Sequence, residues 1–172
     1  LSPSPFLIEQ VVSRIAAPVN VLLRPRFGDF CFTDEEKEIQ LREIEFCAKT
    51  GVNGVVIGAL TPEGELDVPF LSRCMAAAGD LEVTLHRCFD VCRDGFEAIE
   101  TACDLGIQTI LTSGQRATAP EGVENLKALR KFAADRIHLM AGSGVCAANI
   151  PQLHRETGIR HFHLSAKRSE PG

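Results

Sequence analysis

The stretch Glu82-Val83-Thr84-Leu85-His86-Arg87-Cys88-Phe89-Asp90 carries most of what the sequence says about the fold. Its first residues are apolar or β-branched, and helical patterns flank it on both sides, which indicates the strand of a β–α unit. Because an isolated charge within a sheet is costly to bury, we expect His86, Arg87 and Asp90 to follow the carboxyl end of this strand and to face a cleft. A simpler alternative is an Arg87–Asp90 pair that only fixes the turn.

Strand and helix alternate in the same way along the rest of the chain. Besides the strand before His86, strands are predicted at residues 19–23, 55–58, 109–111, 137–141 and 161–164, and helices at 6–16, 34–50, 68–78, 95–105, 123–134 and 147–156. Thr33 and Glu36 form a capping box at the start of the second helix, Gly51 ends it, and Asp67 caps the third. Strict alternation with short connections predicts right-handed crossovers and a parallel sheet.

Polar or glycine-rich residues follow most of the predicted strands, as in Arg24-Pro25-Arg26, Thr112-Ser113-Gly114 and Ser165-Ala166-Lys167. An open doubly wound sheet concentrates its ligand at one switch point, whereas the rim of a barrel gathers residues from many strands. We therefore predict an α/β fold, a parallel (β/α)8 TIM-type barrel. Residues 1–172 are expected to form a single barrel domain that covers about six β–α units and is incomplete at both ends.

The composition narrows the class of protein. A hydrophobic content of 45% and a charged content of 24% are typical of globular domains, and the net charge of −5 argues against nucleic acid as the main partner. No apolar run is long enough to span a bilayer, so no membrane partner is expected. The seven cysteines are scattered and form no CxxC motif, which indicates reduced thiols in a cytoplasmic protein.

Four motifs together resemble the CutC family, cytosolic barrels named for a link to copper homeostasis. They lie at residues 22–30, 84–90, 111–114 and 140–144, and they correspond to the family patterns IRPRGGDF, TFHRAFD, LTSG and MAGGGV. The chain departs from these patterns at Phe27, Cys88 and Ser143, where the family usually has glycine, alanine and glycine. The resemblance runs in order over essentially the whole chain.

The resemblance implies a (β/α)8 barrel, a homo-oligomer, a cytoplasmic location and a role in copper handling, with copper as the expected bound metal. The family's first two strands carry its candidate copper thiols and have no counterpart in this sequence. The resemblance therefore assigns no metal ligand here, and no organic cofactor is predicted. A family name is also not a mechanism.

A second set of predictions comes from the residues themselves. Arg24, Arg26 and Arg87, with Lys167, make the predicted rim basic in an acidic protein, and guanidinium groups bind carboxylates and phosphates with paired donors. His86 and Asp90 are candidates for general acid and base, with Asp29 as a second carboxylate. The alternative for His86 is a hydrogen bond within the barrel mouth and no catalytic part.

Further residues are predicted to bind the substrate. The glycine-rich loop Gly142-Ser143-Gly144 and Ser165 follow the last two strands, where barrels of this type often bind phosphate. Other candidates at strand ends are Thr112, Ser113 and His163. The alternative for the glycine-rich loop is a plain tight turn.

Two functions of different class follow from these candidates. The first is a copper-homeostasis protein that binds Cu(I) through soft ligands, for which the candidates are the most closely spaced thiols, Cys88 and Cys92, and Met140 of a neighbouring strand. The second is a metal-independent enzyme that acts on a small phosphorylated or carboxylated substrate by acid–base chemistry at the barrel mouth.

Overall fold

The computed structural model describes residues 1–165, so Lys167 lies outside the described residues. Six strands alternate with six α-helices and one short 3-10 helix. The strands are β1 Asn20–Leu22, β2 Gly54–Ile57, β3 Glu82–Leu85, β4 Thr109–Thr112, β5 His138–Ala141 and β6 His161–Phe162. The helices are α1 Pro5–Val12, α2 Asp34–Thr50, α3 Val68–Ala78, η1 Arg87–Val91, α4 Gly95–Asp104, α5 Val123–Ala133 and α6 Ile150–Thr157.

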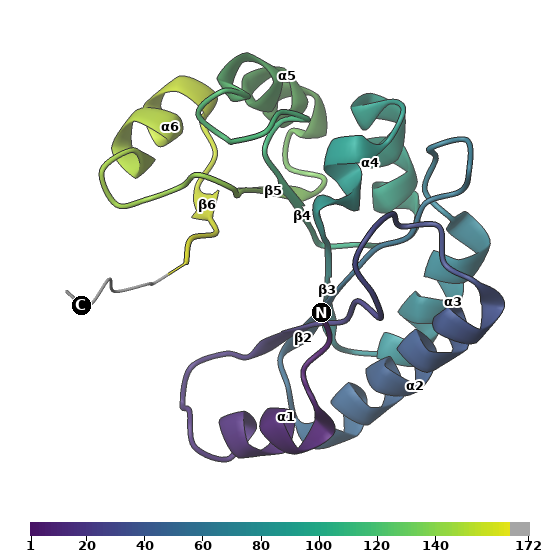
Figure 1. The fold of residues 1–172 in the computed structure, drawn as a ribbon. Coiled ribbons are helices and arrows are strands. Elements are labelled where there is room, and N and C mark those ends of the chain that lie inside the picture. The colour runs from purple at the N-terminus through teal and green to yellow at the C-terminus, as the bar shows by residue number, and fades with distance from the viewer. Residues whose placement is uncertain (166–172) are drawn as a thin grey trace.

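The strands form one parallel sheet in chain order, from β1 to β6. The sheet curls into an incomplete barrel with the helices on its outer side (Figure 1). This arrangement confirms the predicted parallel barrel with about six β–α units. Among the described residues, no helix is both long and apolar enough to cross a bilayer.

Side chains alternate between two environments along the strands. Ile110 and Leu139 are fully buried in the layer between the sheet and the helices, whereas Leu111 and Met140 are only half-buried. Leu22 on β1 is 38% exposed, although both of its neighbours are buried. Since successive residues of a strand point to opposite faces, one face of the sheet packs on the helices and the inner face stays accessible.

The predicted helix signals are confirmed at α2 and α3. The Thr33 hydroxyl accepts a hydrogen bond from the Glu36 amide at 3.3 Å, and the Glu36 carboxylate accepts one from the Thr33 amide at 2.9 Å. Gly51 ends α2 with a φ of 84°, a left-handed conformation that favours glycine. Asp67 caps α3 by accepting from the Phe70 amide at 3.1 Å.

β1 ends one residue earlier than predicted, whereas β3 ends where it was expected to, directly before His86. β1 ends at Leu22, so Arg24 and Arg26 belong to a loop and do not share a strand face. Pro25 has no amide hydrogen to continue the ladder, which limits the strand. β3 ends at Leu85, and the chain turns at His86 into the 3-10 helix η1. The polar residues of both motifs therefore begin where the ladders stop.

Candidate functional site

A cavity of about 520 Å³ lies on the inner face of the sheet. Arg24, His86, Arg87 and His163 line it, and each of them follows the carboxyl end of a strand. The other lining residues are Asn20, Leu22, Phe30, Val56, Thr84, Leu111, Met140 and Phe162. The structure thus gathers four of the predicted site residues, from three separate segments of the chain, around one cavity.

Arg24, Phe30 and His86 form a stack at this cavity. The guanidinium carbon of Arg24 lies 4.4 Å from the centre of the Phe30 ring, and that ring lies 4.9 Å from the centre of the His86 imidazole. Arg24 Nη2 also donates to the Gly28 carbonyl at 2.5 Å. A cation over an aromatic face is attracted by the electrons of the ring, so Phe30 helps to hold the guanidinium in place.

His86 is a neutral imidazole of defined tautomer. Its Nδ1 accepts a hydrogen bond from the Cys88 amide at 3.1 Å, so the ring hydrogen of the neutral form resides on Nε2. Burial and the nearby charge of Arg24 lower the pKa of His86 to about 4. Nε2 is buried and has no hydrogen-bond partner within residues 1–165. At neutral pH the ring therefore offers one N–H donor that is not satisfied.

Gly58, which follows β2, supports the position of this imidazole. A Cβ at residue 58 would lie 2.7 Å from both Cε1 and Nδ1 of His86 and would also overlap Cys88 Sγ. We expect Gly58→Ala to lower the free energy of unfolding by about 2 kcal/mol, because the buried ring and thiol must move. The midpoint of urea unfolding measures this loss.

A double-mutant cycle isolates the cause of that loss. Cys88→Ala removes the sulfur atom that the new Cβ would overlap, so it is expected to cost less stability in the Gly58→Ala background than in the unmodified chain. Additive losses would mean that Gly58 does not act through its contact with this part of the site.

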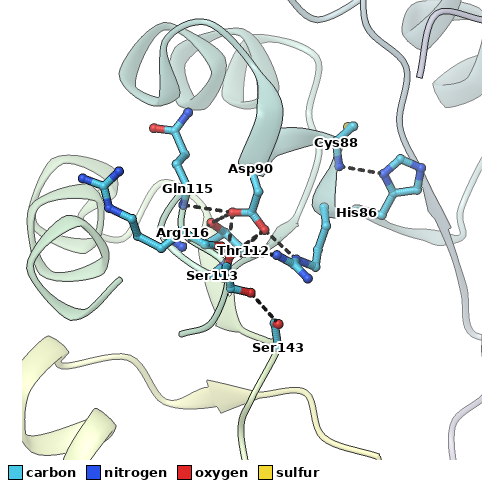
Figure 2. A network of polar contacts seen from close by, with 11 residues as sticks. His86, Cys88, Asp90, Thr112, Ser113, Gln115, Arg116 and Ser143 are labelled. Carbon is cyan, nitrogen blue, oxygen red and sulfur yellow. Dashed lines mark hydrogen bonds and ion pairs between the residues drawn. The ribbon is translucent and has the colours of Figure 1, made fainter. Parts of the chain in front are cut away.

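Asp90 does not line the cavity itself, but it holds Arg87, which does. Its carboxylate accepts hydrogen bonds from the Thr112 hydroxyl at 2.6 Å and from the backbone amides of Ser113 and Gln115 at 2.9 and 3.1 Å. The same carboxylate pairs with Arg87 Nε at 2.6 Å (Figure 2 shows Asp90 among its partners). Asp90 is thereby occupied as an acceptor, and it positions Arg87 at the cavity.

Thr112 and Ser113 belong to this network and are fully buried. The Ser113 hydroxyl contacts Asp90 at 3.0 Å and Arg87 Nη2 at 2.9 Å, and it also lies against the Arg116 carbonyl. Neither residue lines the cavity. Their contacts connect the end of β4 to Arg87.

Arg26 and Asp29 lie away from the cavity. Arg26 Nε pairs with Glu36 at 2.7 Å and its Nη2 pairs with Asp29 at 2.9 Å. The hydrogen bond from Arg26 lowers the pKa of Asp29, whose side chain is 68% exposed. Within the described residues, both side chains connect the loop after β1 to the start of α2.

The glycine-rich loop after β5 packs on a neighbouring segment of the chain. Ser143 and Gly144 both have positive φ angles, of 70° and 68°. The Ser143 hydroxyl, labelled in Figure 2, donates to the Ala117 carbonyl at 2.8 Å. The Ser143 carbonyl accepts a hydrogen bond from the Ala119 amide at 2.9 Å. The Gly142 amide donates to the Thr112 carbonyl at 2.9 Å. These contacts fit a structural turn, the alternative considered for this loop.

The last two candidates differ in position. His163 lines the cavity, and its amide donates to the Ala141 carbonyl at 2.8 Å, which continues the pairing of β6 with β5. Ser165 is exposed and is not among the residues that line the cavity.

Burial holds the two closely spaced thiols in their neutral form. Cys88 and Cys92 are both buried, and burial raises the pKa of Cys88 well above its usual value and that of Cys92 to about 11. Thiolate, not thiol, is the form that binds metals. In the part of the chain that the structure describes, no group of three His, Cys, Asp or Glu residues is placed to hold a metal ion.

The order of the motifs and this fold agree with one known family. The model of the CutC family matches residues 1–168. The chain belongs to the CutC family. A CutC family protein of Xanthomonas campestris pv. campestris is 46% identical over 167 residues, which cover 97% of this chain and 70% of the relative. Another from Bacteroides fragilis is 49% identical over 151 residues, which cover 88% of this chain and 60% of that relative.

A solved CutC structure gives the same result for the fold. It is described as the copper homeostasis protein CutC from Streptococcus agalactiae, and it matches with a TM-score of 0.89 at 30% identity. The match covers 94% of this chain and 80% of the solved chain. The curled sheet described above therefore has the fold of the solved CutC chain over 80% of that chain.

In this CutC chain, sequence reasoning overlooked two residues that shape the site. Phe30 ends the motif at residues 22–30, but only its contacts with Arg24 and His86 show that it links these two side chains. Gly58 lies at the end of a strand, as several other glycines do. Its position could have indicated close packing against a neighbouring segment, because such packing often requires glycine. The apolar residues that line the cavity were harder to predict, because both faces of a strand in a parallel sheet are usually apolar in sequence.

Proposed function

We propose that this CutC protein binds a small anionic substrate, a carboxylate or a phosphate, at the carboxyl ends of its strands. The observation that carries the proposal is the convergence of Arg24, His86 and Arg87 on one cavity of about 520 Å³. Parallel barrels bind their substrates at this end of the sheet, and guanidinium groups suit anions.

The two arginine side chains of the cavity are held in place by different contacts. Asp90 and Ser113 hold Arg87 through Nε and Nη2, and its side chain remains 39% exposed. Arg24 rests on Phe30 and makes one hydrogen bond to the adjoining loop. An anion between them would meet one guanidinium fixed by a carboxylate and one fixed by an aromatic ring. Pre-organised donors of this kind reduce the entropy lost on binding.

The imidazoles supply the acid–base part of the proposal. His86 presents a neutral Nε2–H that lacks an acceptor among residues 1–165, and a substrate oxygen that reached it would complete the hydrogen bond. A neutral imidazole that donates to a carbonyl oxygen stabilises charge developing on that oxygen. His163 lines the same cavity and is the proton acceptor in this proposal. Together they would support proton abstraction next to a carbonyl group, the step shared by aldol and isomerase reactions.

Calorimetric titration with inorganic phosphate and with pyruvate tests the proposal. We expect saturable binding of at least one of these anions, and an affinity about tenfold lower in Arg24→Gln, because one charge-assisted contact is lost. Arg14→Gln is the matched control, since Arg14 is exposed and does not line the cavity. Equal affinity in Arg24→Gln and in Arg14→Gln would overturn the proposal.

Copper binding is the second candidate. It is favoured by the name of the CutC structure from Streptococcus agalactiae and by one feature of the cavity, the presence of the Met140 side chain together with His86 and His163. Thioether and imidazole groups are ligands that copper accepts. In this proposal the copper ion is cargo and takes no part in a reaction step.

Titration with Cu(I) under reducing, oxygen-free conditions distinguishes the two candidates. Tight binding of one equivalent that Met140→Leu weakens would support the copper candidate, because leucine keeps the volume and removes the sulfur atom. Weak binding that Met140→Leu does not alter would leave only the anion proposal standing.

A further inference from the structure

We infer that Gln115 is a positioning residue that fixes the guanidinium group of Arg87 for its ligand. The inference rests on the proposed function, because Arg87 is one of the two arginines of the anion site. Gln115 itself does not line the cavity, and it acts through Asp90. Its contacts join the segments that follow β3 and β4, two neighbouring strands in the middle of the sheet.

The backbone of Gln115 has an unusual conformation. Its φ is 57°, and that of Gly114 before it is 73°. Glycine adopts such left-handed values freely, whereas a glutamine is strained there. The two residues turn the chain so that the amides of Ser113 and Gln115 both donate to Oδ1 of Asp90, at 2.9 and 3.1 Å. Neighbouring amides that converge in this way form a concave anion site, and here the anion is the Asp90 carboxylate.

The side chain of Gln115 supplies the contacts that hold this conformation. Its Nε2 donates to the Cys92 carbonyl at 3.1 Å and lies 3.6 Å from the sulfur atom of the same residue. Its Oε1 packs against Gly95, where a Cβ would come within 2.9 Å of that oxygen. The side chain extends away from Asp90, as Figure 2 shows, to the end of η1 and the start of α4. Strained residues persist where their surroundings hold them, and they are concentrated at functional sites.

Gln115 therefore holds the segment of η1 at two points, at Asp90 through its amide and at Cys92 through its side chain. Asp90 and Ser113 in turn occupy Nε and Nη2 of Arg87, at 2.6 and 2.9 Å. Within residues 1–165, Nη1 is the guanidinium nitrogen of Arg87 that makes no hydrogen bond. Because the guanidinium group is planar, fixing Nε and Nη2 also fixes the direction of Nη1. That direction follows from the position of Asp90.

Replacing Gln115 with glycine separates this role from a contribution to stability. Glycine takes the left-handed conformation without strain, which offsets the lost side-chain contacts, so the midpoint of urea unfolding is expected to change little. Calorimetric titration with inorganic phosphate and with pyruvate is expected to show affinities about threefold lower, because Arg87 is less well pre-organised. Gln115→Met keeps the length of the side chain, removes the donor to Cys92 and is expected to weaken both anions by a similar factor.

Ala134→Gly is the matched control. Ala134 also has a positive φ, of 50°, and it ends α5 without lining the cavity. Glycine relieves the same kind of backbone strain at this position, so stability is expected to change little there as well. The affinities for phosphate and pyruvate are expected to stay those of the unmodified chain.

The orientation of Arg87 can also be measured without a ligand. In nuclear magnetic resonance spectra, the Nε–H signal of Arg87 is identified by its absence in Arg87→Lys, and its hydrogen-exchange rate reports the bond to Asp90. The exchange is expected to be about tenfold faster in both Gln115 variants than in the unmodified chain, and unchanged in Ala134→Gly. A contribution of Gln115 to folding alone would not alter this rate.

The outcomes separate this inference from the proposed function. If the unmodified chain and both Gln115 variants bind the anions alike, the inference is overturned and the proposed function stands. Equal exchange rates in all of these proteins would overturn it as well, because Arg87 would then be held without Gln115. If the unmodified chain binds neither phosphate nor pyruvate, the proposed function fails, and faster exchange in the two variants would still support the hold of Gln115 on Arg87.

Discussion

Replacing Asp90 with alanine is expected to lower the free energy of unfolding by about 3 kcal/mol, the largest loss of stability that a single substitution at the site should cause. The carboxylate accepts hydrogen bonds from the Thr112 hydroxyl and from the amides of Ser113 and Gln115, and these groups have no substitute in the buried turn. Arg87 also loses its partner, but its side chain is 39% exposed and water can solvate it. Most of the cost therefore comes from the orphaned donors of the β4 turn.

Urea unfolding followed by circular dichroism measures this effect. Asp80→Ala is the matched control, because Asp80 is exposed in the turn after α3 and makes no side-chain hydrogen bond among the described residues. The control is expected to change the midpoint very little. If the two substitutions had the same small effect, the network around Asp90 would not stabilise the fold, and Arg87 would need another source of orientation.

The fold was predictable because each of its local signals agrees with the others. The strand and helix pattern, the capping box at Thr33 and the stop at Gly51 all indicate the same β–α repeat. Strand ends were harder to predict than strands. The ladder between β1 and β2 ends at the pair formed by Leu22 and Val56, and only the geometry of both strands decides that position.

Four of the predicted site residues line the cavity, but the sequence did not predict the directions in which the other candidate side chains point. Arg24 and Arg26 are two residues apart, yet Arg24 lines the cavity and Arg26 turns to Glu36 on α2. The loop bends at Gly28, whose φ is 94°, and such a bend leaves no periodic signal in the sequence. Spacing rules for strand faces do not apply once the ladder has ended.

Asp90 illustrates a second limit of sequence reasoning. The sequence marks a carboxylate next to His86 and Arg87, and the same residue types serve equally in acid–base chemistry and in structural networks. Its partners at residues 112, 113 and 115 lie more than twenty positions further along the chain. Only the parallel pairing of β3 with β4 brings them together. The role of Asp90 as a positioning residue follows from that long-range contact.

The second large effect concerns pH, and it arises from His86. The pKa of this imidazole is about 4 in the folded protein, because burial and Arg24 disfavour its charged form, and about 6.5 in the unfolded chain. Between these values the unfolded state binds a proton that the folded state does not. The stabilisation is therefore fully present above about pH 6.5 and is lost as the pH falls towards 4. The expected loss is about 3 kcal/mol.

His86→Asn removes this titration while keeping an acceptor for the Cys88 amide, since the asparagine carbonyl can take the place of Nδ1. Carboxylates titrate at low pH in both proteins, so the difference between their free energies of unfolding isolates the imidazole. From pH 7.5 to pH 4 the unmodified chain should lose about 3 kcal/mol more than the variant. His161→Asn is the control, and because His161 is largely exposed its removal should alter the pH dependence much less. Parallel curves for the unmodified chain and His86→Asn would show that His86 is hydrated or paired in the folded protein, and the neutral Nε2–H donor of the proposed function would then be absent.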